Sequence, residues 1–133
     1  MAREKKVVDA SIVVKWFVDE DGSEEALSLR ADHVAGRVTL VVPELLFLEV
    51  LNTLRYKGGT TETLAVANKA LSDIQFHVEK LNVFLLEKAC QLALEHTLSL
   101  YDATYLALGA IHGSVVVTAD EKLAKAANTS FLK

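Results

Sequence analysis

The chain has 133 residues, which is enough for one domain with a substantial hydrophobic core. A hydrophobic fraction of 51% and a charged fraction of 24% exclude an extensively disordered protein. The net charge of −4 lacks the basic excess of a simple nucleic-acid-binding module. An acidic enzyme that acts on nucleic acids through bound divalent cations stays open, because such cations reverse the local sign of the field.

No apolar run approaches the roughly 18 uncharged residues of a membrane span. The charged N-terminus, with Asp9 soon after it, is unlike a signal peptide. Cys90 is the only cysteine, so no internal disulfide can form. We therefore expect a protein of the reducing cytoplasm that has no membrane partner. Cys90 itself lies in a helical pattern and is expected to be a small core residue.

Short apolar segments alternate with longer helical patterns along the chain. The expected strands are residues 6–9, 39–42, 76–81 and 114–118, with a minimal edge strand at 131–132. The expected helices are residues 11–17, a segment capped by Ser23, residues 43–57 with Pro43 at the helix start, 61–74, a segment to 96 capped by Asn82, 100–113 and 121–128. This alternation predicts βαβ units. The expected fold class is therefore α/β, with three α/β/α layers around a central parallel sheet of four to five short strands, in one domain over residues 1–133.

Four carboxylates lie where apolar elements meet turns or helices. Asp9 follows the first strand, Glu49 lies within an apolar helix, Asp102 is near a helix start, and Asp120 follows the 114–118 strand. An acid in apolar surroundings is costly unless it is paired, hydrogen-bonded or bound to a metal. In an open parallel sheet, sites form beyond the carboxyl ends of the strands. We expect these four side chains to converge there.

Each acid also has a structural interpretation without a catalytic role. Asp9 and Asp120 are good helix N-caps, and Asp102 stands three residues after Ser99, as in a capping box. Glu49 shares a helix face with Asn52 and Tyr56, which is consistent with an ordinary solvated stripe. Capping cannot explain Glu49, and all four structural interpretations are less probable together than any one alone.

Metal-assisted phosphodiester hydrolysis is the chemistry that uses four acids. Mg²⁺ and Mn²⁺ prefer oxygen ligands, and two such ions can hold an attacking water and a leaving oxygen in line. Ser11 and Thr118 are close in sequence to Asp9 and Asp120. Their hydroxyls are expected to orient the carboxylates, with helix or turn capping as the alternative role.

Four ordered blocks resemble the PIN-domain ribonucleases, and most closely the VapC toxins of prokaryotic toxin–antitoxin pairs. The blocks are residues 8–11 (VDAS), 43–52 (PELLFLEVLN), 100–108 (LYDATYLAL) and 117–120 (VTAD), and together they span nearly the whole chain. Each block alone is weakly specific, whereas four in order make a strong match. The resemblance places the family's acids at Asp9, Glu49, Asp102 and Asp120, and the asparagine of the second block at Asn52. The short C-terminus is a departure that leaves the last strand in question.

The resemblance implies a PIN-like fold, Mg²⁺ or Mn²⁺ as cofactor, and hydrolytic cleavage of RNA. The four acids would be both the metal ligands and the catalytic groups, supported by Ser11, Asn52 and Thr118. It also implies a homodimer and a cognate antitoxin that inserts a segment into or near the acidic cleft. Two other functions stay open: a catalytically inactive PIN-fold binding or assembly module, and an aspartyl-phosphate phosphotransferase, which usually has a second acid where this chain has Ser11.

Other polar residues are assigned no chemistry. The four histidines, His33, His77, His96 and His112, are scattered and lack the spacing of a zinc site, so surface or packing roles are expected. Lys15 could meet a phosphate near Asp9, but a solvated helix lysine is preferred. Trp16 and Phe17 are expected in the core or at a subunit interface.

Overall fold

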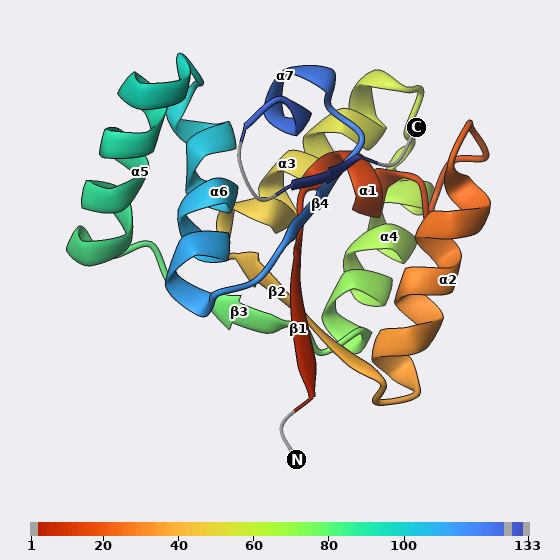
Figure 1. Cartoon of the computed structure of the whole chain (residues 1–133). Helices are drawn as coiled ribbons and strands as arrows, with labels where there is room; N and C mark the ends of the chain where they lie inside the picture. The colour runs from red at the N-terminus through yellow and green to blue at the C-terminus, as the bar shows by residue number, and fades with distance from the viewer. Residues whose placement is uncertain (1–2, 127–128, 132–133) are drawn as a thin grey trace.

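Five parallel strands form a central sheet with helices on both of its faces (Figure 1). The computed structural model describes residues 3–126 and 129–131, and for residue 131 only its backbone. The strands are β1 (Glu4–Val8), β2 (Val38–Pro43), β3 (His77–Glu79), β4 (Val116–Thr118) and β5 (Thr129–Phe131), in the order β3-β2-β1-β4-β5. The predicted parallel α/β sheet of four to five short strands is confirmed. The edge strand β5 does form, although residue 132 lies outside the described residues.

Seven helices surround the sheet in the described part of the chain. They are α1 (Ala10–Val14), α2 (Ser23–Val34), α3 (Leu45–Tyr56), α4 (Thr61–Asp73), α5 (Val83–His96), α6 (Leu100–His112) and α7 (Glu121–Ala124). Figure 1 shows α5 and α6 on one side of the sheet and α2 and α4 on the other, which gives the three layers. None of the helices within residues 3–126 has the length and apolar character needed to cross a bilayer.

The middle of the sheet is apolar because both of its faces are covered. Val7 and Val8 of β1 are fully buried, and β4 is buried along its whole length. Continuous β-branched runs are typical of parallel strands with helices on both sides. Helix α6 approaches β4 closely at Gly109, where an added Cβ would lie 2.7 Å from Val116 Cγ2. This tight packing fixes α6, and with it Asp102 in its first turn.

Several predicted helix boundaries are confirmed, because local capping determines them. Asn82 accepts a hydrogen bond from the Leu85 amide at the start of α5, and Ser99 accepts one from the Asp102 amide at the start of α6. Helix α4 begins at Thr61 as predicted and ends at Asp73, one residue before the predicted end. Trp16 lies in the core, stacked on Phe76 with 5.8 Å between ring centroids.

Two predicted helix starts are wrong by one or two residues. The N-cap of α2 is Gly22, in the left-handed region at φ 86°, because the Ser23 hydroxyl is engaged in the preceding loop. It donates to the Val18 carbonyl and accepts from the Glu20 amide. Pro43 is the last residue of β2 and does not start α3. It pairs with Glu79 of β3, and the amide of the next residue, Glu44, donates a hydrogen bond to the Glu79 carbonyl.

Some strands and helices are shorter than predicted, and Cys90 is more exposed than predicted. The strands expected over 76–81 and 114–118 are shorter, at His77–Glu79 and Val116–Thr118. Helix α1 ends at Val14 and α7 ends at Ala124; the expected end of the last helix, residue 128, lies outside the described residues. Cys90 is exposed on α5, because the buried stripe of that helix is formed by Leu85, Ala89 and Leu92.

Candidate active site

Asp9 and Asp120 project from the same edge of the sheet. Strands β1 and β4 are parallel neighbours, with Val8 beside Val117. Asp9 follows β1 directly, and Asp120 follows β4 with one residue between them. The arrangement expected from the order of the strands is therefore present.

All four predicted acids line one open cleft of about 340 Å³ at this edge. Glu49 reaches it from α3 and Asp102 from the first turn of α6. Ser11 also lines the cleft; the other lining residues are Ala10, Val14, Lys15, Glu20, Thr53, Lys57, Tyr105 and Ala119. Among the described residues, no three of these carboxylates bring their oxygens mutually within 4.8 Å. The acids thus surround an open space and do not touch one another as a compact group.

Asp9 is the most buried of the four acids, with 5% of its surface exposed. Its Oδ1 accepts hydrogen bonds from Ser11 Oγ at 2.6 Å and from the Ile12 amide at 3.3 Å, and its Oδ2 accepts one from Thr118 Oγ1 at 2.5 Å. Burial nevertheless raises the pKa of Asp9 to about 6, against the lowering effect of these donors. A carboxylate offers about four acceptor positions, so about one remains for a further ligand.

The same two hydroxyls connect Asp9 to the loop that carries Asp120. Ser11 Oγ accepts a hydrogen bond from the Ala119 amide at 2.9 Å, and Thr118 Oγ1 accepts one from the Asp120 amide at 2.9 Å. Each hydroxyl therefore donates to one acid and accepts from the backbone beside the other. Ser11 bonds the carboxylate of its expected neighbour Asp9, whereas Thr118, which was expected beside Asp120, bonds Asp9 across the two strands.

Helix capping also occurs at both strand ends. Asp9 caps α1 through the Ile12 amide, and Asp120 accepts from the amides of Lys122 and Leu123 at the start of α7. Asp9 and Asp120 are therefore helix caps. Capping does not exclude a role in the cleft, because each carboxylate also lines it.

Glu49 is half-buried and held by one strong contact. Tyr105 donates from its hydroxyl to Glu49 Oε1 at 2.5 Å. Burial raises the pKa of Glu49, the bond from Tyr105 opposes that shift, and the charges of Asp102 and Asp9 add to it. Tyr105 is almost fully buried, and burial with the nearby Glu49 charge raises its own pKa. Its hydroxyl therefore remains a donor at neutral pH.

Mutual repulsion links all four acids. Burial raises the pKa of Asp102, and the charge of Asp120 raises it further. Asp120 also raises the pKa of Asp9, as Asp102 and Asp9 raise that of Glu49. Clustered carboxylates with raised pKa values are typical of functional sites. An added cation would relieve both the repulsion and the burial cost.

Two lysines, Lys15 and Lys57, flank the acids, and the prediction that Lys15 is solvated is wrong. Lys15 is buried, with 8% exposed, and does not extend into solvent as predicted. Its Nζ lies 3.3 Å from Glu20 Oε1 and donates to the Asp21 carbonyl. Lys57 Nζ lies 3.4 Å from Glu20 Oε2. The short α1 explains the difference, because the chain turns back after it and the 19–21 loop covers Lys15.

The structure does not bring Asn52 into the cleft. Asn52 is exposed on α3, and Thr53 lines the cleft beside Glu49. On α3, the residue four positions after Glu49 faces the cleft and the residue three positions after it does not. Thr53 therefore lies beside Glu49, and Asn52 does not. Thr53, Lys57 and Tyr105 were not identified from the sequence. The i, i+4, i+8 spacing of Glu49, Thr53 and Lys57 was the available signal.

Residues 6–128 match the family model described as the PIN domain. The chain belongs to the PIN-domain family. The protein named ribonuclease VapC3, from Pyrobaculum aerophilum, is 34% identical over 127 residues, which cover 91% of this PIN domain and 93% of that protein. The resemblance to PIN-domain ribonucleases of the VapC type, inferred above from four sequence blocks, is thereby confirmed.

Solved structures share the fold of this PIN domain at low identity. A toxin–antitoxin complex from Klebsiella pneumoniae superposes with a TM-score of 0.74 at 19% identity, covering 96% of this chain and 98% of that one. The toxin VapC20 of Mycobacterium tuberculosis, described as cleaving the sarcin–ricin loop, gives a TM-score of 0.70 at 21% identity, covering 92% and 95%. VapBC2 from Rickettsia felis, bound to a promoter DNA fragment, gives 0.66 at 11% identity, covering 97% and 99%.

Proposed function

We propose that this PIN domain, acting as one domain over residues 1–133, is a metal-dependent endoribonuclease. The observation that carries the proposal is the convergence of Asp9, Glu49, Asp102 and Asp120 on one cleft. These four acids are proposed as the metal ligands and catalytic groups. The name of the ribonuclease relative supports RNA as the substrate.

The donor set fits Mg²⁺ or Mn²⁺. All four proposed ligands are carboxylates, and hard divalent cations prefer oxygen ligands and retain waters. Burial, with the charge of Asp120 as a smaller contribution, raises the pKa of Asp9, and a divalent cation bound beside it would favour the ionised carboxylate. When bound, such an ion supplies Lewis-acid activation of the phosphodiester and of the attacking water.

The residues of the chain would then divide the remaining tasks. Ser11 and Thr118 hold both oxygens of Asp9 in one orientation, and Tyr105 does the same for Glu49. Water adds to phosphorus, the bond to the leaving oxygen breaks, and that oxygen takes up a proton. Lys57, partly exposed at the cleft, offers a positive charge to the RNA backbone.

We further propose that the protein is the toxin of a VapBC-type pair. VapC-named relatives and the fold shared with toxin–antitoxin complexes support this role. An apolar groove lined by Phe17, Val18, Leu54 and Leu64 adjoins the acidic cleft, since Lys57 lines both. A segment of the antitoxin that filled the groove would reach the acids. The absence of a membrane partner and a cytoplasmic location belong to the same proposal.

The proposed homodimer is supported by apolar side chains on α5. Val83, Phe84 and Leu94 are 82%, 74% and 86% exposed. Large apolar side chains grouped on one helix are typical of surfaces that pair with another protein. A Phe84→Asp variant should run as a monomer in light scattering; a wild-type protein that is already monomeric would contradict the dimer.

The decisive test of the function is metal-dependent cleavage of RNA. The purified protein should cut total RNA into defined fragments with Mn²⁺ or Mg²⁺ and stop when EDTA is added. Its expression without an antitoxin should arrest growth, which separates a toxin from a general nuclease. Calorimetric titration with Mn²⁺ tests the binding-module alternative, since an inactive scaffold should show no heat that depends on Asp9.

A further inference from the structure

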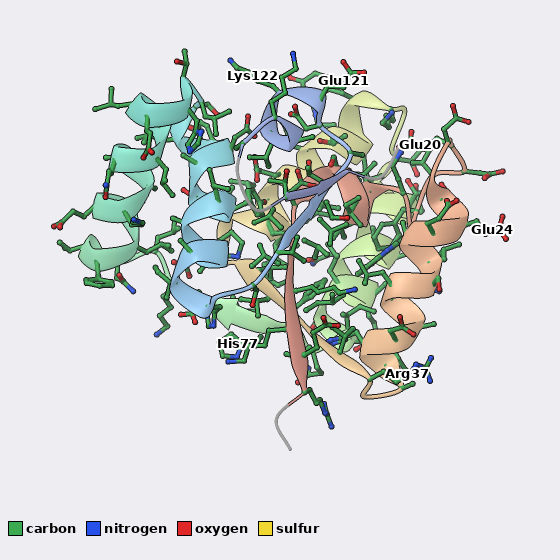
Figure 2. The ribbon with its side chains drawn as sticks, viewed as in Figure 1. Glu20, Glu24, Arg37, His77, Glu121 and Lys122 are labelled. Carbon is green, nitrogen blue, oxygen red and sulfur yellow. The ribbon has the colours of Figure 1, made fainter. Side chains whose placement is uncertain are left out.

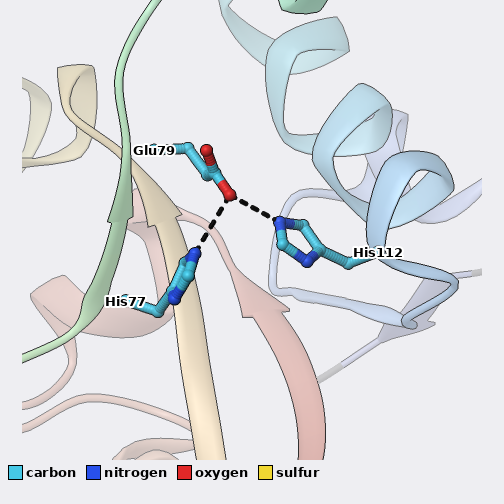
Figure 3. Close-up of side chains that lie close together, drawn as sticks. All are labelled: His77, Glu79 and His112. Carbon is cyan, nitrogen blue, oxygen red and sulfur yellow. Dashed lines mark hydrogen bonds and ion pairs between the residues drawn. The ribbon is translucent and has the colours of Figure 1, made fainter.

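Three metal-ligating side chains meet at a second position in the molecule. His77 Nε2 lies 3.0 Å from Glu79 Oε1, and His112 Nε2 lies 2.8 Å from the same oxygen. Figure 3 shows both rings converging on this one carboxylate oxygen. One donor atom from each of the three residues lies within 4.8 Å of the others, which is the only such trio among the described residues. We call His77, Glu79 and His112 the histidine cluster.

The fold brings these residues together from two elements. His77 and Glu79 are two residues apart on β3, so their side chains point to the same face of the sheet. His112 is the last residue of α6, which packs on β1, β2 and β4. The spacing in the sequence, which excluded a zinc motif on one helix, could not reveal a cluster that forms only between a strand and a helix.

The histidine cluster is separate from the acidic cleft. His112 follows Asp102 by ten residues on α6, about 15 Å at the helical rise of 1.5 Å per residue. Strand β3 is at the edge of the sheet, two strands away from β1. In Figure 2, His77 lies well apart from Glu121 and Lys122, which follow Asp120.

We propose that His77, Glu79 and His112 bind a transition-metal ion of the zinc class, independently of the function proposed for the acidic cleft. Imidazole nitrogen favours Zn²⁺, Ni²⁺ and Cu²⁺ over Mg²⁺, so the two sites differ in selectivity. Two ligands at about 2.0–2.1 Å from a tetrahedral ion stand about 3.3 Å apart. The observed 2.8 and 3.0 Å need to open by only a few tenths of an ångström.

Both imidazoles can present the correct nitrogen by a change of tautomer. In the metal-free form each Nε2–H donates to the carboxylate, which has no proton to give. When that proton is on Nδ1 instead, the lone pair of each Nε2 points toward Glu79 Oε1, where an ion could bind between the three ligand atoms. The side chains of His77, Glu79 and His112 are 44%, 32% and 12% exposed, so water can complete the coordination.

A bound ion would connect the edge strand β3 to the C-terminal end of α6. The unfolded chain does not hold these three residues together, so binding should stabilise the folded state. Zinc should therefore raise the Tm in metal-free buffer and give a saturable calorimetric binding curve near one ion per chain.

The test uses zinc titration of the full chain in a Cys90→Ser background, because Cys90 is an exposed thiol that could bind zinc by itself. His77→Gln and His112→Gln should each weaken zinc binding by more than about tenfold and abolish the shift in Tm. His96→Gln is the matched control, since it removes a histidine outside the cluster and should leave the zinc affinity unchanged. Each variant is first compared with its parent for Tm without metal.

Asp102→Asn separates this site from the acidic cleft. It should leave zinc binding at the histidine cluster unchanged, whatever it does to RNA cleavage. Zinc binding that is lost with Asp102→Asn and retained with His112→Gln would assign the ion to the cleft and overturn the proposal. So would the absence of saturable zinc binding to the parent, in which case the cluster is a hydrogen-bonded contact between β3 and α6.

Discussion

The hydroxyl of Thr118, at the end of β4, donates to Oδ2 of Asp9, which follows the neighbouring strand β1, at a distance of 2.5 Å. The same hydroxyl accepts from the amide of Asp120. One fully buried side chain thus determines the position of two cleft acids that are far apart in the sequence. Its removal should therefore affect both of them.

Thr118→Val should reduce activity without changing the shape of the core. Valine keeps the volume but leaves an Asp9 oxygen and the Asp120 amide without their partner, which costs about 1–3 kcal/mol in stability. We expect metal affinity or cleavage to fall by about 10–100-fold. Thr118→Ser, which keeps the hydroxyl, should retain most activity. Equal activity of the valine and serine variants would show that this hydrogen bond has no positioning role.

In the metal-free protein, Asp9→Asn should become more stable relative to wild type as the pH rises from 4.5 to 7.5. The folded-state pKa of Asp9, about 6, lies above its ordinary value of 3.8. The ionised group therefore disfavours the folded state: this cost is absent below about pH 3.8, grows between pH 3.8 and 6, and is complete above 6. The two-unit shift corresponds to an upper limit of about 3 kcal/mol.

Denaturant unfolding in EDTA measures this effect at pH 7.5 and at pH 4.5. The stability of the variant minus that of wild type should rise by about 1–2 kcal/mol from pH 4.5 to pH 7.5, whereas the cost of the hydrogen bond that the amide nitrogen cannot accept is the same at both pH values. A stability difference that stayed the same at both pH values would contradict the burial cost assigned to Asp9.

Tyr105→Phe should shift the pH dependence of cleavage. The bond from Tyr105 lowers the pKa of Glu49, so its loss raises that pKa further. Activity that requires ionised Glu49 should then appear at a higher pH than in wild type. Tyr56→Phe is the matched control, because Tyr56 is 76% exposed on the same helix as Glu49. An unchanged pH profile in Tyr105→Phe would remove Tyr105 from the proposed site.

Lys57→Ala should weaken the binding of RNA more than the chemical step. Loss of one phosphate contact with a single strand should reduce the slope of log affinity against log salt by about 0.7. Lys80→Ala removes an exposed lysine outside the cleft and should leave that slope unchanged. Binding is measured with Ca²⁺ in place of Mn²⁺ to suppress cleavage. If both variants gave the wild-type slope, Lys57 would not contact the RNA.

The sequence was sufficient for the sheet and for the four acids because both depend on local patterns. The apolar strands, the helix caps at Asn82 and Ser99, and the acids at strand ends each leave a short-range signal. The α/β order then limits where strand ends meet. The convergence of Asp9 and Asp120 follows from that rule once β1 and β4 are neighbours, as they are in the structure.

Contacts between distant segments were the part that the sequence did not reveal. Lys15 is buried because the 19–21 loop folds over it, and Tyr105 meets Glu49 because α6 and α3 border the same cleft. The histidine cluster joins β3 to the far end of α6. None of these pairs has a fixed spacing along the chain, so periodicity carries no information about them.

The rate of RNA cleavage by Asp102→Asn with Mn²⁺ tests the central claim most directly. Asparagine keeps the size of the side chain but removes its charge. The backbone amide of residue 102 can still donate to the Ser99 hydroxyl that caps α6. Asp19→Asn is the matched control, because Asp19 is exposed and does not line the cleft. With folding checked by Tm, we predict a loss of at least about 100-fold for Asp102→Asn and none for Asp19→Asn. Cleavage by Asp102→Asn at the wild-type rate would contradict the assignment of the acidic cleft as the active site.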